Sequence, residues 1–204
     1  MDLIERIETT RFLGAEFLVW LWFCSETFDG KFVLDAGPLE LWLDSPLSLE
    51  SQLQPGERIA LRGIHPSATA EAKEALRQNK LPTRARLVLR TESHEFALVL
   101  DAATLGVSGA SVPAVLSRDS DEAFLERMTL LDTLHRTLDE LFASFVRQRL
   151  DVGWEKRWVP AMASWMREEP IGAALLRGLT ADRASGGESQ KRKGAGRPSG
   201  ARPA

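Results

Sequence analysis

Apolar residues follow two different spacings along the chain, and the spacing changes from one segment to the next. From Arg11 to Phe23 they recur at helical spacing, and Thr9 or Thr10 can cap a helix at its start. Three short segments of alternating apolar and polar residues follow, at 31–34, 39–43 and 58–62. Turn-forming dipeptides, among them Ser45-Pro46, separate these segments, so we predict a helix followed by antiparallel strands.

Longer elements follow in the rest of the chain. An amphipathic helix over 70–78 is capped by Ser67 or Thr69, and strands over 83–90 and 94–100 form a hairpin. From Ser120 apolar residues recur every three or four positions, which predicts one long helix that ends before Gly153. A broken helical segment with three tryptophans and a short helix over 171–179 follow.

These elements predict a single α+β domain over residues 1–184 and a disordered basic tail over 185–204. In the domain, an antiparallel sheet with hairpins packs against the Trp-rich first helix and the long helix. The tail is rich in Gly, Ser, Arg, Lys and Pro, which is typical of disorder. We predict that the tail is dispensable for folding, because it contains no aliphatic residue larger than alanine.

Composition favours a cytoplasmic protein. Cys24 is the single cysteine, so one chain can form neither a disulfide nor a cysteine metal site. The N-terminus lacks the positive segment of a signal peptide, and the apolar run from Phe17 to Cys24 is far shorter than the roughly 18 residues of a membrane helix. We therefore expect no association with a membrane.

The sequence lacks the motifs of the common enzyme classes. It has no phosphate-binding glycine loop, no His-Glu-x-x-His and no Gly-x-Ser-x-Gly. His65, His94 and His135 fall on different predicted elements without the spacing of metal ligands. We predict a protein that is not an enzyme and needs no cofactor or metal, although a site assembled from distant residues would leave no such signature.

Basic residues are concentrated in one part of an acidic chain. Residues 58–90 contain eight basic and two acidic side chains, whereas the whole chain carries a net charge of −3. Alternation along the strand predicts that Arg84, Arg86 and Arg90 project from one face, about 7 Å apart, where they could follow a line of phosphates. The alternative is a solvated face on which these arginines pair with Glu92 or Glu95.

The tail adds a second basic segment. Residues 186–204 contain five basic residues and one acidic residue. Lys191, Arg192 and Lys193 precede Gly196-Arg197-Pro198, which resembles part of an AT-hook, a motif that binds the minor groove of DNA. The arginine usual before that glycine is Ala195 here. A basic tail that only aids solubility is the alternative.

Two stretches resemble the C-terminal portion of the bacterial recombination-associated protein RdgC. They are Asn79-Lys80-Leu81-Pro82-Thr83-Arg84 with the strand that follows, and the segment from Asp121 to Met128. The order of predicted elements from Gly30 to Leu150 is also similar. The family's additional N-terminal region has no counterpart in this chain, which begins with the Trp-rich helix.

The resemblance implies a DNA-binding protein that is not an enzyme, forms a ring-like dimer around duplex DNA and limits the access of a RecA-type recombinase. It places DNA contacts at Arg62, Lys80 and Arg84. With the strand and the tail, the predicted DNA-binding residues are Arg62, Lys80, Arg84, Arg86, Arg90, Lys191, Arg192, Lys193 and Arg197. The leading hypothesis is therefore a nucleoid-associated homodimer that binds double-stranded DNA without sequence preference.

The long helix supports an alternative hypothesis. Its apolar residues from Phe124 to Val146 form a continuous seam, close to the 3.5-residue repeat of paired helices. Such a seam either packs against the chain's own sheet or joins two copies. The alternative to a DNA-binding protein is thus a dimeric protein-interaction module with no role on DNA.

Overall fold

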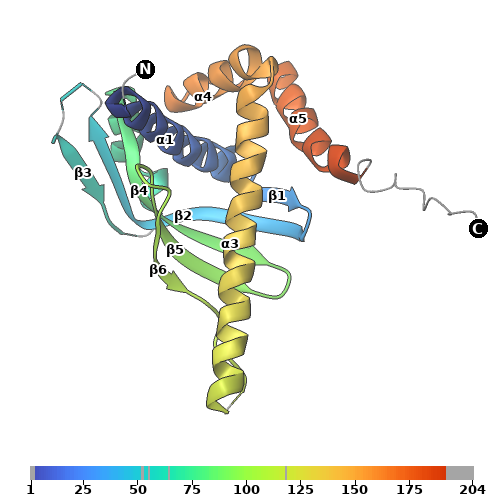
Figure 1. The fold of residues 1–204 in the computed structure, drawn as a ribbon. Coiled ribbons are helices and arrows are strands. Elements are labelled where there is room, and N and C mark those ends of the chain that lie inside the picture. The colour runs from blue at the N-terminus through green and yellow to red at the C-terminus, as the bar shows by residue number, and fades with distance from the viewer. Residues whose placement is uncertain (1–2, 52, 55, 64, 118, 192–204) are drawn as a thin grey trace, which may run out of the picture.

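The protein folds as an antiparallel sheet with helices packed against it, as the sequence predicts (Figure 1). The structure is a computed structural model that describes residues 3–191 except residues 52, 55, 64 and 118, and gives only the backbone of residues 3–12, 182 and 184–191. The strands are β1 (Lys31–Leu34), β2 (Gly37–Ser51), β3 (Arg58–Leu61), β4 (Lys80–Thr91), β5 (Glu95–Asp101) and β6 (Val107–Ser111). The fold class is therefore α+β.

The sheet is organised around the long strand β2. Its order is β1-β2-β4-β5-β6. β3 pairs with the second half of β2, on the same edge of that strand where β1 pairs with the first half. The predicted hairpin is confirmed as β4 and β5, in which Leu87 lies opposite Leu98. β6 was not predicted, because its sequence Val-Ser-Gly-Ala-Ser has few of the residues that favour strands. It forms by pairing with the edge of β5.

The turn predicted at Ser45-Pro46 is wrong. These residues lie inside β2, where a bulge separates Asp44, opposite Arg86, from Leu47, opposite Ala85. Proline has no N–H to donate to the neighbouring strand, and a bulge accommodates it without ending the strand. Because the bulge inserts two residues, Leu43 and Leu47 both still face the core.

Helix α1 (Leu3–Thr27) crosses the inner face of the sheet. It begins eight residues before the predicted start at Arg11, so Thr9 and Thr10 lie inside it rather than capping it. Every side chain from Phe17 to Cys24 is buried, because strands cover one side of the helix and other helices cover the rest. Apolar groups therefore surround this segment, which explains why its own apolar residues are not confined to one side of the helix.

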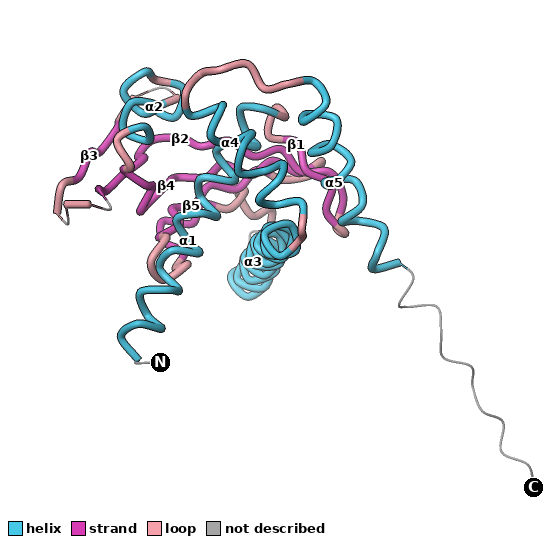
Figure 2. The backbone as a smooth tube through the Cα atoms, turned by 90° about the horizontal axis from the view of Figure 1, so that it is seen from above, coloured by secondary structure: helices cyan, strands magenta, loops and turns pink. Residues whose placement is uncertain are grey.

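The other helices begin close to their predicted positions. Thr69 caps α2 (Ala70–Arg77) by accepting a hydrogen bond from the Ala72 N–H at 3.2 Å. Asp119 caps α3 (Ser120–Leu150) by accepting from the N–H groups of Asp121 and Glu122. Seen along its axis, α3 lies to one side of the strands (Figure 2). Its first turns extend past the edge of the sheet (Figure 1).

The C-terminal segment is helical and, as predicted, is interrupted rather than continuous. A π-helical turn, η2 (Trp154–Trp158), leads into α4 (Val159–Met166), and α5 (Ala173–Lys191) follows Pro170. Trp154 and Trp158 are buried against Phe145 and Trp20, which join α1, α3 and η2 in one aromatic core. α5 continues past the boundary predicted at residue 184, and the predicted tail residues 192–204 lie outside the described part of the chain.

Candidate functional site

The three arginines of β4 lie on one face of the strand, as alternation predicts. Ala85 and Leu87 are fully buried on the inner face, whereas Arg84 and Arg90 are exposed on the outer face and Arg86 is partly exposed. The outer face is turned away from α1 and the core. The backbone thus places these side chains where phosphate groups could reach them.

Acidic residues from other segments pair with most of this basic run. Six of the eight basic residues between positions 58 and 90 form ion pairs: Arg58–Glu50, Lys73–Glu26, Arg77 with Glu74 and Glu168, Lys80–Glu57, Arg86–Asp44, and Arg90 with Glu40 and Glu95. Most of these carboxylates lie outside residues 58–90 in the sequence. The local charge of the sequence therefore does not become an equally basic surface.

Arg90 is the most fully engaged of the β4 arginines. Its guanidinium donates two hydrogen bonds to Glu95, at 2.8 and 3.0 Å, and lies 4.9 Å from the ring centre of Trp42. Glu40, on the strand at its other side, is 3.8 Å away. The cross-strand pairing that the sequence left as an alternative is therefore present at Arg90. A phosphate at this position has to compete with two carboxylates.

Arg86 is held by a single acid. Its Nε lies 3.6 Å from Asp44, which is too far for a hydrogen bond, and this buried atom has no hydrogen-bond partner among the described residues. Desolvating an N–H without a partner is unfavourable, so Arg86 is held less firmly than Arg90.

Lys80 is separated from the arginines by a bulge. Ser48 lies opposite Arg84, but the next residue of β2, Leu49, lies opposite Pro82, so Thr83 is an extra residue in β4. This shift turns Lys80 to the inner face, where it is buried and contacts Glu57 at 2.8 Å. Lys80 and Arg84, grouped by the family resemblance, therefore face opposite sides of the sheet.

Arg62 and Arg84 are predicted DNA-binding residues that are exposed and form no ion pair with the described residues. Both are exposed, and Arg84 makes one long hydrogen bond of 3.4 Å to Ser108. Arg62 directly follows β3 and Arg84 lies on β4, and these two strands pair with opposite edges of β2. Of the tail residues, Lys191 ends α5, whereas Arg192, Lys193 and Arg197 lie outside the described residues.

Groups with catalytic potential are scattered. His65 precedes η1 (Pro66–Ala68), His94 lies in the β4–β5 turn and His135 lies on α3. Among the described residues, no three His, Cys, Asp or Glu side chains come close enough to hold a metal ion. Burial raises the pKa of the Cys24 thiol to about 12, so this thiol stays protonated near neutral pH.

The predicted apolar seam of α3 divides into two parts. Leu134, Leu138, Leu141 and Phe145 are buried against the rest of the chain. At the start of α3, Phe124, Leu125 and Met128 are 63%, 64% and 50% exposed. These three residues form the apolar cluster, and such a group of exposed apolar residues on a protruding helix is typical of an interaction surface.

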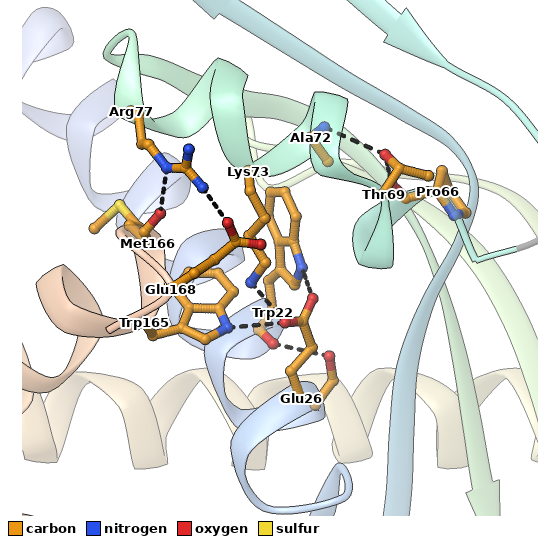
Figure 3. A network of polar contacts seen from close by, with 11 residues as sticks. Trp22, Glu26, Pro66, Thr69, Ala72, Lys73, Arg77, Trp165, Met166 and Glu168 are labelled. Atoms are coloured by element: carbon orange, nitrogen blue, oxygen red, sulfur yellow. Dashed lines mark hydrogen bonds and ion pairs between the residues drawn. The ribbon is translucent and has the colours of Figure 1, made fainter. Parts of the chain in front are cut away.

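Sequence reasoning missed a partly buried ion pair that joins three helices (Figure 3). Lys73 of α2, only 6% exposed, donates to Glu26 of α1 at 2.6 Å and lies 3.5 Å from the ring centre of Trp165 of α4. Glu26 also accepts hydrogen bonds from the indole N–H groups of Trp22 and Trp165. In the sequence, Lys73 was counted as one basic surface residue. Its partners are far away along the chain, so no local pattern could identify this pair.

The fold and these surfaces define an α+β protein with a protruding helix that carries exposed apolar residues. Comparisons with models of known protein families, with curated proteins and with solved structures find no match for this chain. The resemblance to the RdgC family therefore stays a prediction. None of the helices in the described residues is long and apolar enough to cross a membrane.

Proposed function

We propose that the chain is a self-associating interaction module that binds a second copy of itself through the apolar cluster. The exposure of Phe124, Leu125 and Met128 at the protruding start of α3 carries this proposal. Covering such side chains removes apolar area from water, which contributes about 25 cal/mol per Å². In a two-fold symmetric dimer each copy offers the same surface, so one exposed helix face is sufficient.

The charges on α3 favour an antiparallel arrangement of the two helices. The first turn is acidic, with Asp121 and Glu122, whereas Arg136 lies four turns later on the exposed side. An antiparallel pair centred near Met128 brings the acidic turn of each copy toward Arg136 of the other. Arg136 is paired with Asp132 at the surface, and such exposed pairs exchange at little cost.

Replacing Phe124 and Met128 together with serine is expected to weaken self-association about a hundredfold. Both side chains are about half exposed in one copy, so covering each contributes roughly 0.7 kcal/mol, and because a symmetric dimer contains both substitutions twice, four such contributions, about 3 kcal/mol in all, are lost from the association. Sedimentation equilibrium measures this constant. The matched control is Leu150→Ser with Val152→Ser, because both residues are 79% exposed but lie at the opposite end of α3. Equal weakening by the control pair would contradict the proposed surface.

DNA binding is a second candidate function, supported by the exposure of Arg62 and Arg84 and by the basic tail in the sequence. On this proposal the protein binds duplex without sequence preference, as the resemblance to RdgC implies. It receives less support than self-association, because Arg86 and Arg90 already have acidic partners.

If the β4 face binds DNA, Arg84→Gln is expected to flatten the slope of log affinity against log salt concentration by about 1, since one phosphate contact is lost. Arg90→Gln is the matched control on the same face, because Arg90 is held by Glu95. It should leave the slope unchanged. Gel-shift titrations at two salt concentrations measure both slopes. Equal slopes for Arg84→Gln and the unmodified protein would exclude this face as the DNA surface.

A further inference from the structure

A small apolar cavity opens between α3, α1 and the β5–β6 end of the sheet. Its volume is about 130 Å³, and its apolar wall includes Phe17, Leu100, Leu138 and Phe142. Phe17 and Leu100 are buried core residues, so the floor of the cavity is held by the fold itself. Apolar cavities of about 150 Å³ accommodate a single benzene ring. This cavity therefore has the size and lining for one aromatic ring.

Two hydrogen-bond acceptors stand among the residues that line it. His135 and Asp139 lie one helical turn apart on α3. Nδ1 of His135 is 2.9 Å from the carbonyl oxygen of Leu131, so in the neutral ring Nδ1 donates and Nε2 remains an acceptor. The Asp139 carboxylate is exposed and takes no hydrogen bond or ion pair from the described residues. Together the two groups suit a ligand that donates several N–H bonds.

Leu105 lines the cavity from a strained position. Its φ of 54° is left-handed, a region that branched side chains such as leucine rarely adopt. The turn that imposes this angle is fixed by Asp101, which accepts hydrogen bonds from the N–H groups of Ala103 and Thr104, and by Thr104, which accepts from Gly106. Backbone strain of this kind persists where the surrounding structure holds it and often occurs at ligand sites.

We propose that this cavity binds a small primary amine that carries one aromatic ring. The ring occupies the apolar floor, and the ammonium group donates to the Asp139 carboxylate and to Nε2 of His135. A ligand of this class matches both the volume of the cavity and the acceptors among its lining residues, whereas an anion would be repelled by Asp139.

Titration of the full chain with phenethylamine, followed by amide chemical shifts in NMR, tests the proposal. We expect saturable binding with a dissociation constant in the millimolar range, which is usual for a ligand of about nine non-hydrogen atoms. The shifts should concentrate at Leu105, Val107 and residues 135–142. An absence of saturation up to about 20 mM, or shifts confined to other elements, would overturn the proposal.

Two variants identify the parts of the site. Asp139→Asn should weaken phenethylamine binding about tenfold and leave the binding of 2-phenylethanol, which has the ring but no charge, unchanged. Asp132→Asn, seven residues earlier on α3, should leave both unchanged. Val107→Phe should fill the cavity and abolish the binding of both probes. Equal affinities for phenethylamine in Asp139→Asn and the unmodified chain would contradict the proposed carboxylate contact.

The cavity is complete in one copy of the chain, although the proposed dimer brings the partner's acidic turn toward Arg136, next to His135. It lies beyond the apolar cluster along α3, at residues 135–142 rather than 124–128. The Phe124→Ser, Met128→Ser protein should therefore retain its affinity for phenethylamine. Loss of amine binding in that variant would show that the site needs a second copy of the chain and would contradict a cavity complete in one copy.

Discussion

Replacement of Glu26 by alanine is expected to lower the free energy of unfolding by about 3 kcal/mol, because it leaves the buried Lys73 ammonium without its carboxylate partner. The Lys73 side chain is 7% exposed and that of Glu26 is 26% exposed, so the pair is partly buried and solvent can replace only part of the lost interaction. The substitution also leaves the indole N–H groups of Trp22 and Trp165 without their acceptor. Urea unfolding followed by tryptophan fluorescence measures the change.

The pH dependence of the stability lost in Glu26→Ala distinguishes an effect of charge from an effect of packing. Burial lowers the pKa of Lys73, and the ion pair with Glu26 acts in the opposite direction. Because the pKa of Lys73 is lower in the folded than in the unfolded protein, its contribution to stability rises as pH increases between the two values. Without Glu26 the pKa of Lys73 in the folded protein falls further. The difference in stability between Glu26→Ala and the unmodified protein should therefore become smaller as pH rises in the alkaline range. A defect independent of pH would contradict a buried charge as its cause.

Glu95→Ala is the matched control for this prediction. The pair of Glu95 with Arg90 is nearly as short, at 2.8 Å against 2.6 Å, but both side chains are 53% exposed. Exposed pairs contribute about 0–1 kcal/mol, so this substitution should change stability by less than about 1 kcal/mol. Comparable losses from Glu26→Ala and Glu95→Ala would show that burial does not determine the strength of these pairs.

Gly14→Ala is expected to destabilise the protein by about 1–3 kcal/mol, although alanine normally stabilises the interior of a helix relative to glycine by about 1 kcal/mol. A Cβ at position 14 would lie 1.9 Å from the carbonyl oxygen of Ala102. Ala102 cannot shift easily, because it is buried and its N–H donates to Thr83 at 2.8 Å. Glycine is therefore required where α1 approaches the end of β5.

Gly178→Ala in α5 provides the control. There a Cβ would meet the Cδ of Arg157 at 3.0 Å, a flexible side chain rather than backbone. The helix propensity of alanine should dominate, and stability should stay the same or rise slightly. Thermal unfolding measures both variants. A stabilising effect of Gly14→Ala would show that α1 and β5 are further apart than described.

The elements predicted best from the sequence are those specified by local patterns. The β4–β5 hairpin and the start of α3 follow from alternation and from a capping aspartate, which act over a few residues. The start of α1 was missed, because Thr9 and Thr10 resemble caps but the residues before them also form helix. Pro46 resembled a turn, because its bulge depends on a neighbouring strand that the local sequence does not reveal.

The candidate surfaces were predicted less well, because they depend on contacts between distant segments. Acidic residues far away in the sequence, among them Glu26, Asp44 and Glu168, form ion pairs with the basic residues of positions 58–90. Lys80 faces the opposite side of the sheet from Arg84, because one bulge in β4 reverses the alternation of side chains. The seam of α3 was visible in the sequence, but the positions of α1, β1, η2 and α5 together determine which half is covered.

The central claim is that the apolar cluster joins two copies of the chain. Sedimentation velocity of the intact protein over a range from about 1 to 200 µM, at moderate salt and without DNA, tests it most directly. The account predicts a concentration-dependent shift from a 22.6 kDa monomer to a dimer of twice that mass. A strict monomer at the highest concentration would contradict it.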